Sequence, residues 1–168
     1  MVRRKKRRKS IDMLCALIYN RVLIAAILAW VTGQFLKPPL DYFLNRRWNW
    51  GVIISPGGFP STHAALVTAV TVSIGIQEGL GSPLFALAVA VTMIVVYDAA
   101  GVRRQAGIHA QRINALMKRF FESGQFPEPE LKEVLGHTPF EVIAGIILGI
   151  LISLVVYWLL PANPAKAC

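Results

Sequence analysis

Long apolar runs separated by short polar stretches are the feature that most limits how this chain folds. The runs cover Thr62 to Ile76, Leu84 to Tyr97 and Val142 to Leu160, and another lies within Ile11 to Leu36. A helix needs roughly twenty residues to cross the hydrocarbon layer, and the last run is long enough. The central runs need residues from their flanks or a thinned bilayer. The pattern predicts an all-α integral membrane bundle with three to four transmembrane helices.

The composition also indicates a membrane protein. The chain has 168 residues, of which 55% are hydrophobic and 16% charged, with a mean hydropathy of +0.52. A net charge of +9 would suggest nucleic-acid binding in a soluble protein, but seven of the 18 basic residues lie between Arg3 and Lys9. Such a tail typically binds anionic headgroups. We therefore expect membrane lipids as partners and no nucleic acid, while a homodimer is compatible with the sequence.

The chain divides into a basic tail (1–10), a membrane-embedded domain (11–160) and a C-terminal tail (161–168). We expect a multi-pass protein of the plasma or inner membrane. Proline pairs break helices, so Pro38-Pro39 is predicted to end the first helix. The aromatic and basic residues from Leu40 to Trp50 then indicate a short amphipathic helix on the membrane surface.

The distribution of basic residues bears on the first helix, which is interrupted by Asn20 and Arg21. Arg21 would either snorkel or face the protein interior. If Met13 to Leu36 crosses the membrane, the far face carries nine basic residues, against the positive-inside rule. A re-entrant first helix would place the tail and these residues together in the cytoplasm, and the charge distribution favours it. The nine are Lys37, Arg46, Arg47, Arg103, Arg104, Arg112, Lys118, Arg119 and Lys132.

A loop rich in proline and glycine precedes the first central run and ends at His63. Pro60 stops any preceding helix, and Ser61 or Thr62 is placed to cap the next one by accepting a backbone N–H. His63 then falls in the first turn, where the helix N–H groups and dipole favour an anion. A phosphate site is one interpretation, and a capped helix start with an interfacial histidine is the other.

Two further polar segments return to the membrane face of His63. The stretch from Gln77 to Pro83 is typical of a turn, so the central runs form a helical hairpin whose two crossings bring Asp98 back to that face. The polar segment that follows has helical spacing from Val102 to Phe121. It leads to His137 just before the last run, so His137 lies on the same face as well.

The residues on this face fit phosphoryl transfer. His137 and Glu141 are four apart, one helical turn. A carboxylate that accepts a hydrogen bond from one imidazole nitrogen fixes the tautomer and leaves the other nitrogen basic, so that it can attack phosphorus. His63 on the opposite side of the phosphorus would protonate the leaving oxygen. Arg103 and Arg104, with helix N–H groups, would neutralise the equatorial oxygens.

Simpler interpretations stay open. His137 could be a helix-end or interface histidine, and Glu141 a snorkelling carboxylate. A zinc site formed by His63, His109 and His137 is another alternative, although no cysteine joins them. The sequence offers no compact Asp/Glu cluster for Mg²⁺, and we expect neither a metal nor another cofactor.

Three stretches together resemble the divergent members of the type 2 phosphatidic acid phosphatase (PAP2) superfamily, relatives of acid phosphatases and vanadium haloperoxidases. They run from Pro56 to His63, from Tyr97 to Gly107 and from Leu135 to Val142. The superfamily's Pro-Ser-Gly-His motif corresponds to Pro60 to His63, and its last motif, a histidine with an acid four residues later, resembles His137 and Glu141. The resemblance implies a PAP2-like fold with His137 as nucleophile, Glu141 as orienting carboxylate and His63 as leaving-group acid.

The superfamily's first motif, a lysine with an arginine-proline pair seven positions later, is not matched after Lys37. No Ser-Arg pair closely precedes His137 either, so a phosphate-binding arginine would come from Arg103 or Arg104. The phosphate-binding candidates are Lys37, Ser61, Thr62, Asp98, Arg103 and Arg104.

The sequence therefore predicts a membrane phosphatase that hydrolyses a lipid phosphate or diphosphate through a phosphohistidine, without metal. The lipid tail would enter between the two central runs. The alternative is a catalytically weak or inactive PAP2-like protein that binds phosphorylated headgroups or organises a complex. A small transporter has little support beyond the polar residues near the membrane.

Overall fold

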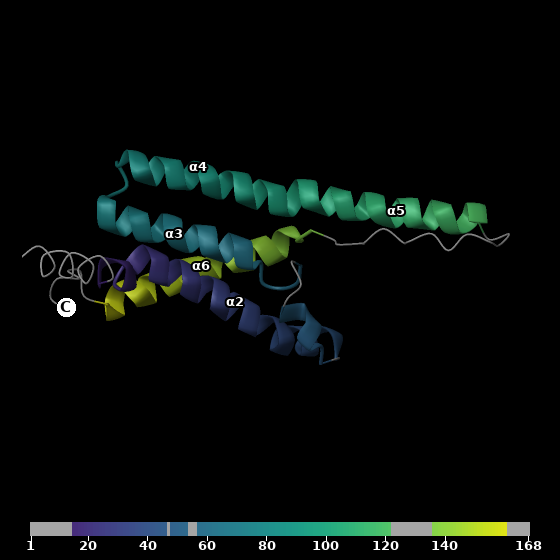
Figure 1. Ribbon diagram of the computed structural model, residues 1–168, viewed down its shortest axis with the longest axis horizontal. Coiled ribbons are helices and arrows are strands. Elements are labelled where there is room, and N and C mark those ends of the chain that lie inside the picture. Colours follow the sequence, from purple (N-terminus) through teal and green to yellow (C-terminus); the bar gives the residue numbers. More distant parts are fainter. Residues whose placement is uncertain (1–14, 47, 54–56, 122–135, 161–168) are drawn as a thin grey trace, which may run out of the picture.

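The computed structural model of the protein describes residues 15–46, 48–53, 57–121 and 136–160. Within these ranges the chain is helical and contains no strand (Figure 1). The elements in chain order are α2 (Arg21–Asn45), the 3₁₀ helix η1 (Trp50–Ile53), α3 (Thr62–Glu78), α4 (Pro83–Tyr97), the π-helix η2 (Asp98–Val102), α5 (Arg103–Phe121) and α6 (Pro139–Leu159).

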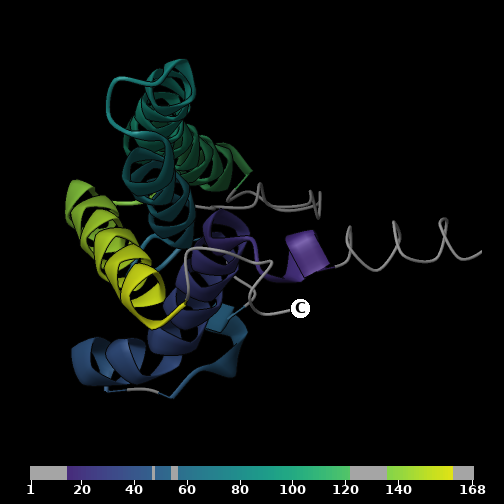
Figure 2. The same cartoon turned by 90° about the vertical axis from the view of Figure 1, so that its left-hand side faces the viewer.

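Three helical stretches in the described part of the chain are long and apolar enough to cross a membrane. They are Arg21–Phe43, Pro83–Lys118 and Pro139–Leu159, the second of which joins α4, η2 and α5. The helix α3 has 17 residues and packs between α2, α4 and α6 (Figures 1 and 2). The predicted all-α membrane bundle with three to four transmembrane helices is confirmed.

Close packing of α3 on α6 is possible because α6 has glycines at the contact. A methyl group at Gly149 would lie 2.5 Å from the carbonyl oxygen of Ala65, and one at Gly145 would overlap the carbonyl oxygen of Ser61. The hydroxyl of Ser153, one turn further on, donates to the carbonyl of Ala69 at 3.0 Å. Small residues that let backbones approach are the usual basis of helix packing in membranes.

The first long helix, α2, runs antiparallel to α6 and packs against it. At one end Arg21 is buried, donates through Nη2 to the carbonyl oxygen of Leu160, and lies over the ring of Tyr157 with its Cζ 5.1 Å from the ring centroid. At the other end Lys37 interacts electrostatically with Glu141, in the first turn of α6. Arg21 therefore faces the protein interior. The helix is long and apolar enough to cross a membrane, and the re-entrant arrangement stays a prediction.

The Pro38-Pro39 pair does not end α2, which continues to Asn45. The ring of Pro38 is fully buried, so packing offsets the lost hydrogen bond and the clash that proline brings to a helix interior. The amphipathic surface helix expected from Leu40 to Trp50 is also wrong, because its first half is the end of α2. The helix ends at the left-handed C-cap Arg46. The chain then turns back, so that the centroid of the Trp48 ring lies 5.7 Å from that of Tyr42 in the last turn of α2.

The polar segment after α4 forms a helix, as its spacing predicts. The chain passes from α4 through η2 into α5 without a break, and α5 extends past the other helices (Figure 1). The basic tail 1–10 and the C-terminal tail 161–168 lie outside the described residues.

Candidate active site

Three chain segments meet at the end of the bundle where α3 and α6 begin. The backbone N–H of Ser61, just before α3, donates to the carbonyl of Glu141 at 3.0 Å. The backbone N–H of His137, just before α6, donates to the carbonyl of Ala99 in η2 at 3.1 Å. The three segments that helix parity assigns to one membrane face are thus joined directly by main-chain hydrogen bonds.

The start of α6 holds His137 and Glu141 together. Thr138 caps the helix: its Oγ1 accepts the N–H of Glu141 at 3.3 Å, and Oε2 of Glu141 accepts the N–H of Thr138 at 3.2 Å. The same Oε2 lies 2.9 Å from Nδ1 of His137. A carboxylate is an acceptor, so Nδ1 carries the proton and Nε2 is the basic nitrogen of the ring.

The basic nitrogen of His137 is buried and unsatisfied. The residue is 3% exposed, and Nε2 has no hydrogen-bond partner within the described ranges. An unpaired polar atom inside a protein costs about 1–3 kcal/mol and calls for an explanation. A bound ligand that brings a hydrogen-bond donor or an electrophile to Nε2 would explain why this nitrogen has no partner within the protein.

His63, on α3, lies near the ring of His137. Ser61 is the N-cap of α3, with its Oγ accepting the N–H of Ala64 at 3.4 Å, so His63 is the second residue of the helix. Its side chain is exposed, and the centroids of the His63 and His137 rings are 6.5 Å apart. The buried ring and the exposed ring are close enough to contact a single phosphoryl group.

Lys37 brings a buried positive charge to the same end of the bundle. It is 1% exposed, and a methyl group on Gly58 would lie 3.9 Å from its Cδ, so its stem runs beneath the Pro/Gly-rich loop. Gly58 has a φ of 95°, a conformation that favours glycine. A buried ammonium needs an opposite charge nearby, and Glu141 is the carboxylate with which it interacts.

Comparison with known proteins identifies the family. A profile of the Divergent PAP2 family matches residues 18–152, which include both histidines and Glu141. This chain belongs to the Divergent PAP2 family. The uncharacterized membrane protein YuiD of Bacillus subtilis (strain 168) is 39% identical over 150 residues, which cover 83% of this chain and 95% of that protein. No solved structure matches the chain.

Two of the predicted phosphate ligands of this PAP2 family member face inward. Ser61 and Thr62 are both fully buried. The hydroxyl of Ser61 is used as the cap of α3, and a methyl group on Gly33 of α2 would lie 2.8 Å from Cγ2 of Thr62. Their side chains build the junction between loop and helix, and a role in binding phosphate stays a prediction.

Three further predicted ligands, Asp98, Arg103 and Arg104, lie on the continuous helical stretch formed by α4, η2 and α5. Asp98 is half-buried at the first position of η2, and Arg104 is half-buried in α5. A role for Arg104 in binding phosphate stays a prediction. The backbone of Arg103 begins α5, and its side chain lies outside the description.

The zinc alternative finds no support in the structure. His109 is exposed on α5. Within the part of the chain that the structure describes, no three His, Cys, Asp or Glu side chains gather as they would around a metal ion.

Two features of the site were not anticipated from the sequence. The first is a small buried apolar cluster where the three segments meet. It consists of Ala64, Ala99 and Val142, one residue each from α3, η2 and α6. The run of small residues around Ala99 could have indicated a close approach, and π-helices often occur at functional sites. The cap at Thr138 was visible as a Thr-x-x-Glu capping box, with proline at the first helical position.

Proposed function

We propose that this PAP2-like membrane protein is a phosphatase that hydrolyses a lipid phosphate or diphosphate through a phosphohistidine at His137. The observation that carries the proposal is the state of the His137 ring. Its Nδ1 is held by Glu141 at 2.9 Å, its buried Nε2 is unpartnered among described residues, and the centroid of the His63 ring is 6.5 Å from that of the His137 ring. This is the arrangement of a nucleophile with an orienting base partner and a second acid–base group.

In the proposed reaction, Nε2 of His137 forms a bond to phosphorus as the bond from phosphorus to the lipid oxygen breaks. The leaving oxygen takes a proton from the imidazolium of His63. Water then attacks the phosphohistidine, with His63 accepting its proton, and releases phosphate and the free His137 ring. Glu141 stabilises the positive ring of the intermediate, and the charge of Lys37 and the N–H groups of α3 favour the anionic phosphoryl oxygens.

A second function, headgroup binding without turnover, has one observation in its favour. Nε2 of His137 is covered from solvent, although a nucleophile must reach its substrate. In that case the phosphate would rest against His63 and the first turn of α3, and no bond to His137 would form.

The two functions are separated by purified protein in liposomes and a panel of lipid phosphates and diphosphates. Phosphate release is expected, with inhibition by vanadate. His137→Ala should abolish it, and His63→Ala should lower the rate about 100-fold or more because general acid catalysis is lost. His109→Ala is the matched control, because His109 is exposed on α5, and should retain the rate.

Two results would count against the phosphatase. If the unaltered protein binds the lipids but releases no phosphate from any of them, headgroup binding is its function. If His137→Ala keeps the rate of the unaltered protein, His137 is not the nucleophile.

A further inference from the structure

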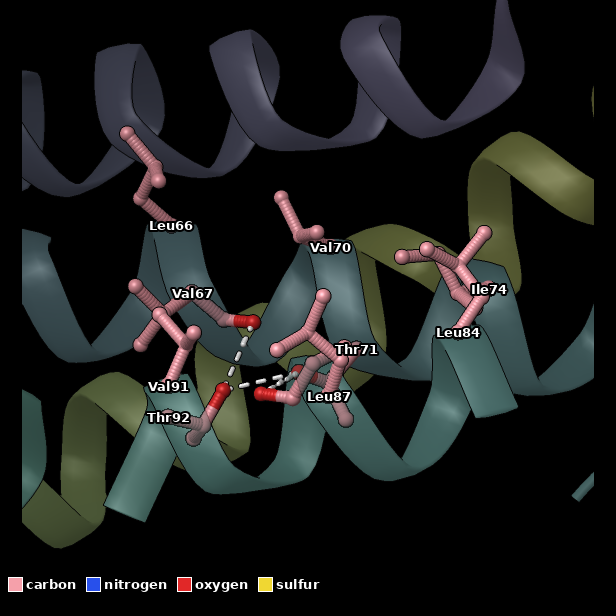
Figure 3. Close-up of a pocket in the computed structure, with 10 residues that line it drawn as sticks. Leu66, Val67, Val70, Thr71, Ile74, Leu84, Leu87, Val91 and Thr92 are labelled. Carbon is pink, nitrogen blue, oxygen red and sulfur yellow. Dashed lines mark hydrogen bonds between the residues drawn. The ribbon is translucent and has the colours of Figure 1, made fainter. Parts of the chain in front are cut away.

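An apolar groove runs between α3 and α4, outside the site described above. Its volume is about 310 Å³. Figure 3 shows its lining residues, which come from both helices. They are Leu66, Val67, Val70, Thr71 and Ile74 of α3 and Leu84, Leu87, Ala88, Val91 and Thr92 of α4.

The two hydroxyl groups in the groove are already paired. Oγ1 of Thr71 lies 2.7 Å from Oγ1 of Thr92, and the two groups point toward each other between the helices (Figure 3). Thr71 also bonds to the carbonyl of Ala88 at 3.1 Å, and Thr92 to the carbonyl of Val67 at 3.2 Å. Each hydroxyl hydrogen is therefore used within the helix pair, and the groove offers its occupant an apolar surface.

The groove starts one helical turn beyond His63 on α3. Leu66 is one helical turn beyond His63, and Ile74 is eight residues further along α3, which corresponds to about 12 Å. The groove therefore points from the site end of the bundle into the depth of the membrane. Its rim on α4, formed by Leu84, Leu87 and Val91, is exposed, so the groove opens sideways toward the lipid hydrocarbon.

We propose that this groove holds a hydrocarbon chain of the substrate and thereby makes the site specific for phosphate carried on a slender chain about 12 Å or more in length. The inference rests on the proposed phosphatase function, whose reacting group would sit at the mouth of the groove. Lipid chains of the bilayer are as apolar as the groove, so moving the substrate chain from the bilayer into the groove adds little affinity. The groove instead positions the phosphate of the substrate at the histidines. A phosphate ester without such a chain would reach the same histidines without being held in place.

Labelling tests the occupant without any need for turnover. The probe is an alkyl phosphate with a photoactivatable diazirine in the middle of its chain, placed in liposomes with the full-length protein. Mass spectrometry should find most of the label on the lining residues of α3 and α4, and the matching alkyl alcohol without phosphate should label them several-fold less. Label spread evenly over the exposed faces of α4 and α6 would mean bulk lipid only and would overturn the proposal.

Blocking the groove tests its effect on specificity. Val91→Trp fills it, and Val155→Trp is the control, because Val91 and Val155 are 45% and 50% exposed and Val155 lies on α6. The ratio of hydrolysis of a long-chain alkyl phosphate to that of phenyl phosphate should fall about 10-fold in Val91→Trp and stay constant in the control, a loss of positioning. An unchanged ratio in both variants, or cross-linking of a second protein chain at the groove, would contradict the proposal.

The two experiments also separate this inference from the phosphatase itself. A protein without turnover whose groove still takes the label in a phosphate-dependent manner would lose the proposed activity and keep the groove as a lipid site. If both esters are hydrolysed and Val91→Trp leaves the ratio of their rates unchanged, the phosphatase function stands and the proposed role of the groove is contradicted.

Discussion

The two ring nitrogens of His137 have different surroundings, and this difference sets what the residue can do. Nδ1 is held by Glu141, whose carboxylate also bonds to the backbone N–H of Thr138. Nε2 has no partner in the described part of the chain. Because the carboxylate both orients the ring and completes the helix cap, its charge and its geometry have separate consequences.

Glu141→Gln separates these two consequences. The amide oxygen can still accept the N–H of Thr138, since glutamine also serves in capping boxes, so the midpoint of thermal unfolding in detergent should change little. The negative charge that stabilises the imidazolium is lost, and lipid phosphate hydrolysis should fall about 100-fold or more by analogy with other orienting carboxylates. If the unfolding midpoint of Glu141→Gln falls and the loss of hydrolysis is explained by the smaller folded fraction, Glu141 has a structural role only.

The sequence predicts this pair well because it is local. Four residues separate His137 from Glu141, and the helix start at Thr138 fixes their relation. Lys37 was named as a candidate, but its position beneath the Pro/Gly-rich loop depends on the course of α2 past two prolines, which no local rule gives. Arg104 was proposed from its basic character alone, and its role in binding phosphate stays a prediction.

At the scale of elements, α3 is the helix on which the others pack. It carries Ser61 as cap and His63 in its first turn, and it contacts α2, α4 and α6. Its distance from α6 is set by Gly145 and Gly149, whose missing side chains leave room for backbone carbonyls of α3.

Gly149→Ala tests this contact, because helix propensity and packing predict opposite changes in the free energy of unfolding. Alanine favours an isolated helix over glycine by roughly 1 kcal/mol. The added methyl group would lie 2.5 Å from the carbonyl oxygen of Ala65, a backbone atom that cannot rotate away, so we expect a net loss of about 1–3 kcal/mol. Thermal unfolding in detergent measures the sign. Gly81→Ala is the control, because no atom lies within 4 Å of the added methyl group, and stabilisation by Gly149→Ala would contradict the packing.

The hairpin, the helix after it and the last span follow from periodicity and turn residues. The end of α2 does not, because the rule that proline pairs break helices considers only the local backbone. In this bundle the buried ring of Pro38 gains tertiary packing, and packing overrides the local preference. The same error displaced the predicted surface helix.

At the scale of the whole molecule, the bundle has two different ends. One end holds the histidines, Glu141 and Lys37. The other holds Arg21 with Leu160 and the turn between α3 and α4. Because α2 connects the two ends, the chain before Arg21 enters on the side opposite to the histidines.

Cysteine labelling measures this arrangement. Gly81→Cys lies in the turn between α3 and α4, and Gln105→Cys lies on α5 beyond the site end; both positions are exposed. A membrane-impermeant maleimide applied to sealed vesicles should label one variant and not the other, relative to the unaltered protein, and should label both after permeabilisation. An epitope tag before Met1 should share the side of Gly81. Labelling of Gly81→Cys and Gln105→Cys from the same side would contradict the full-length crossing of α2.

The hydrogen bonds that join the site segments come from the main chain of Ser61, Glu141, His137 and Ala99. Side-chain replacement does not remove them, so a double variant without both imidazoles should keep the outline of the site. Under the proposed phosphatase function, such a variant would act as a substrate trap that binds a lipid phosphate without hydrolysing it. For the same reason, a related protein that had lost its catalytic histidines in evolution would still have a site shaped to bind a phosphorylated lipid.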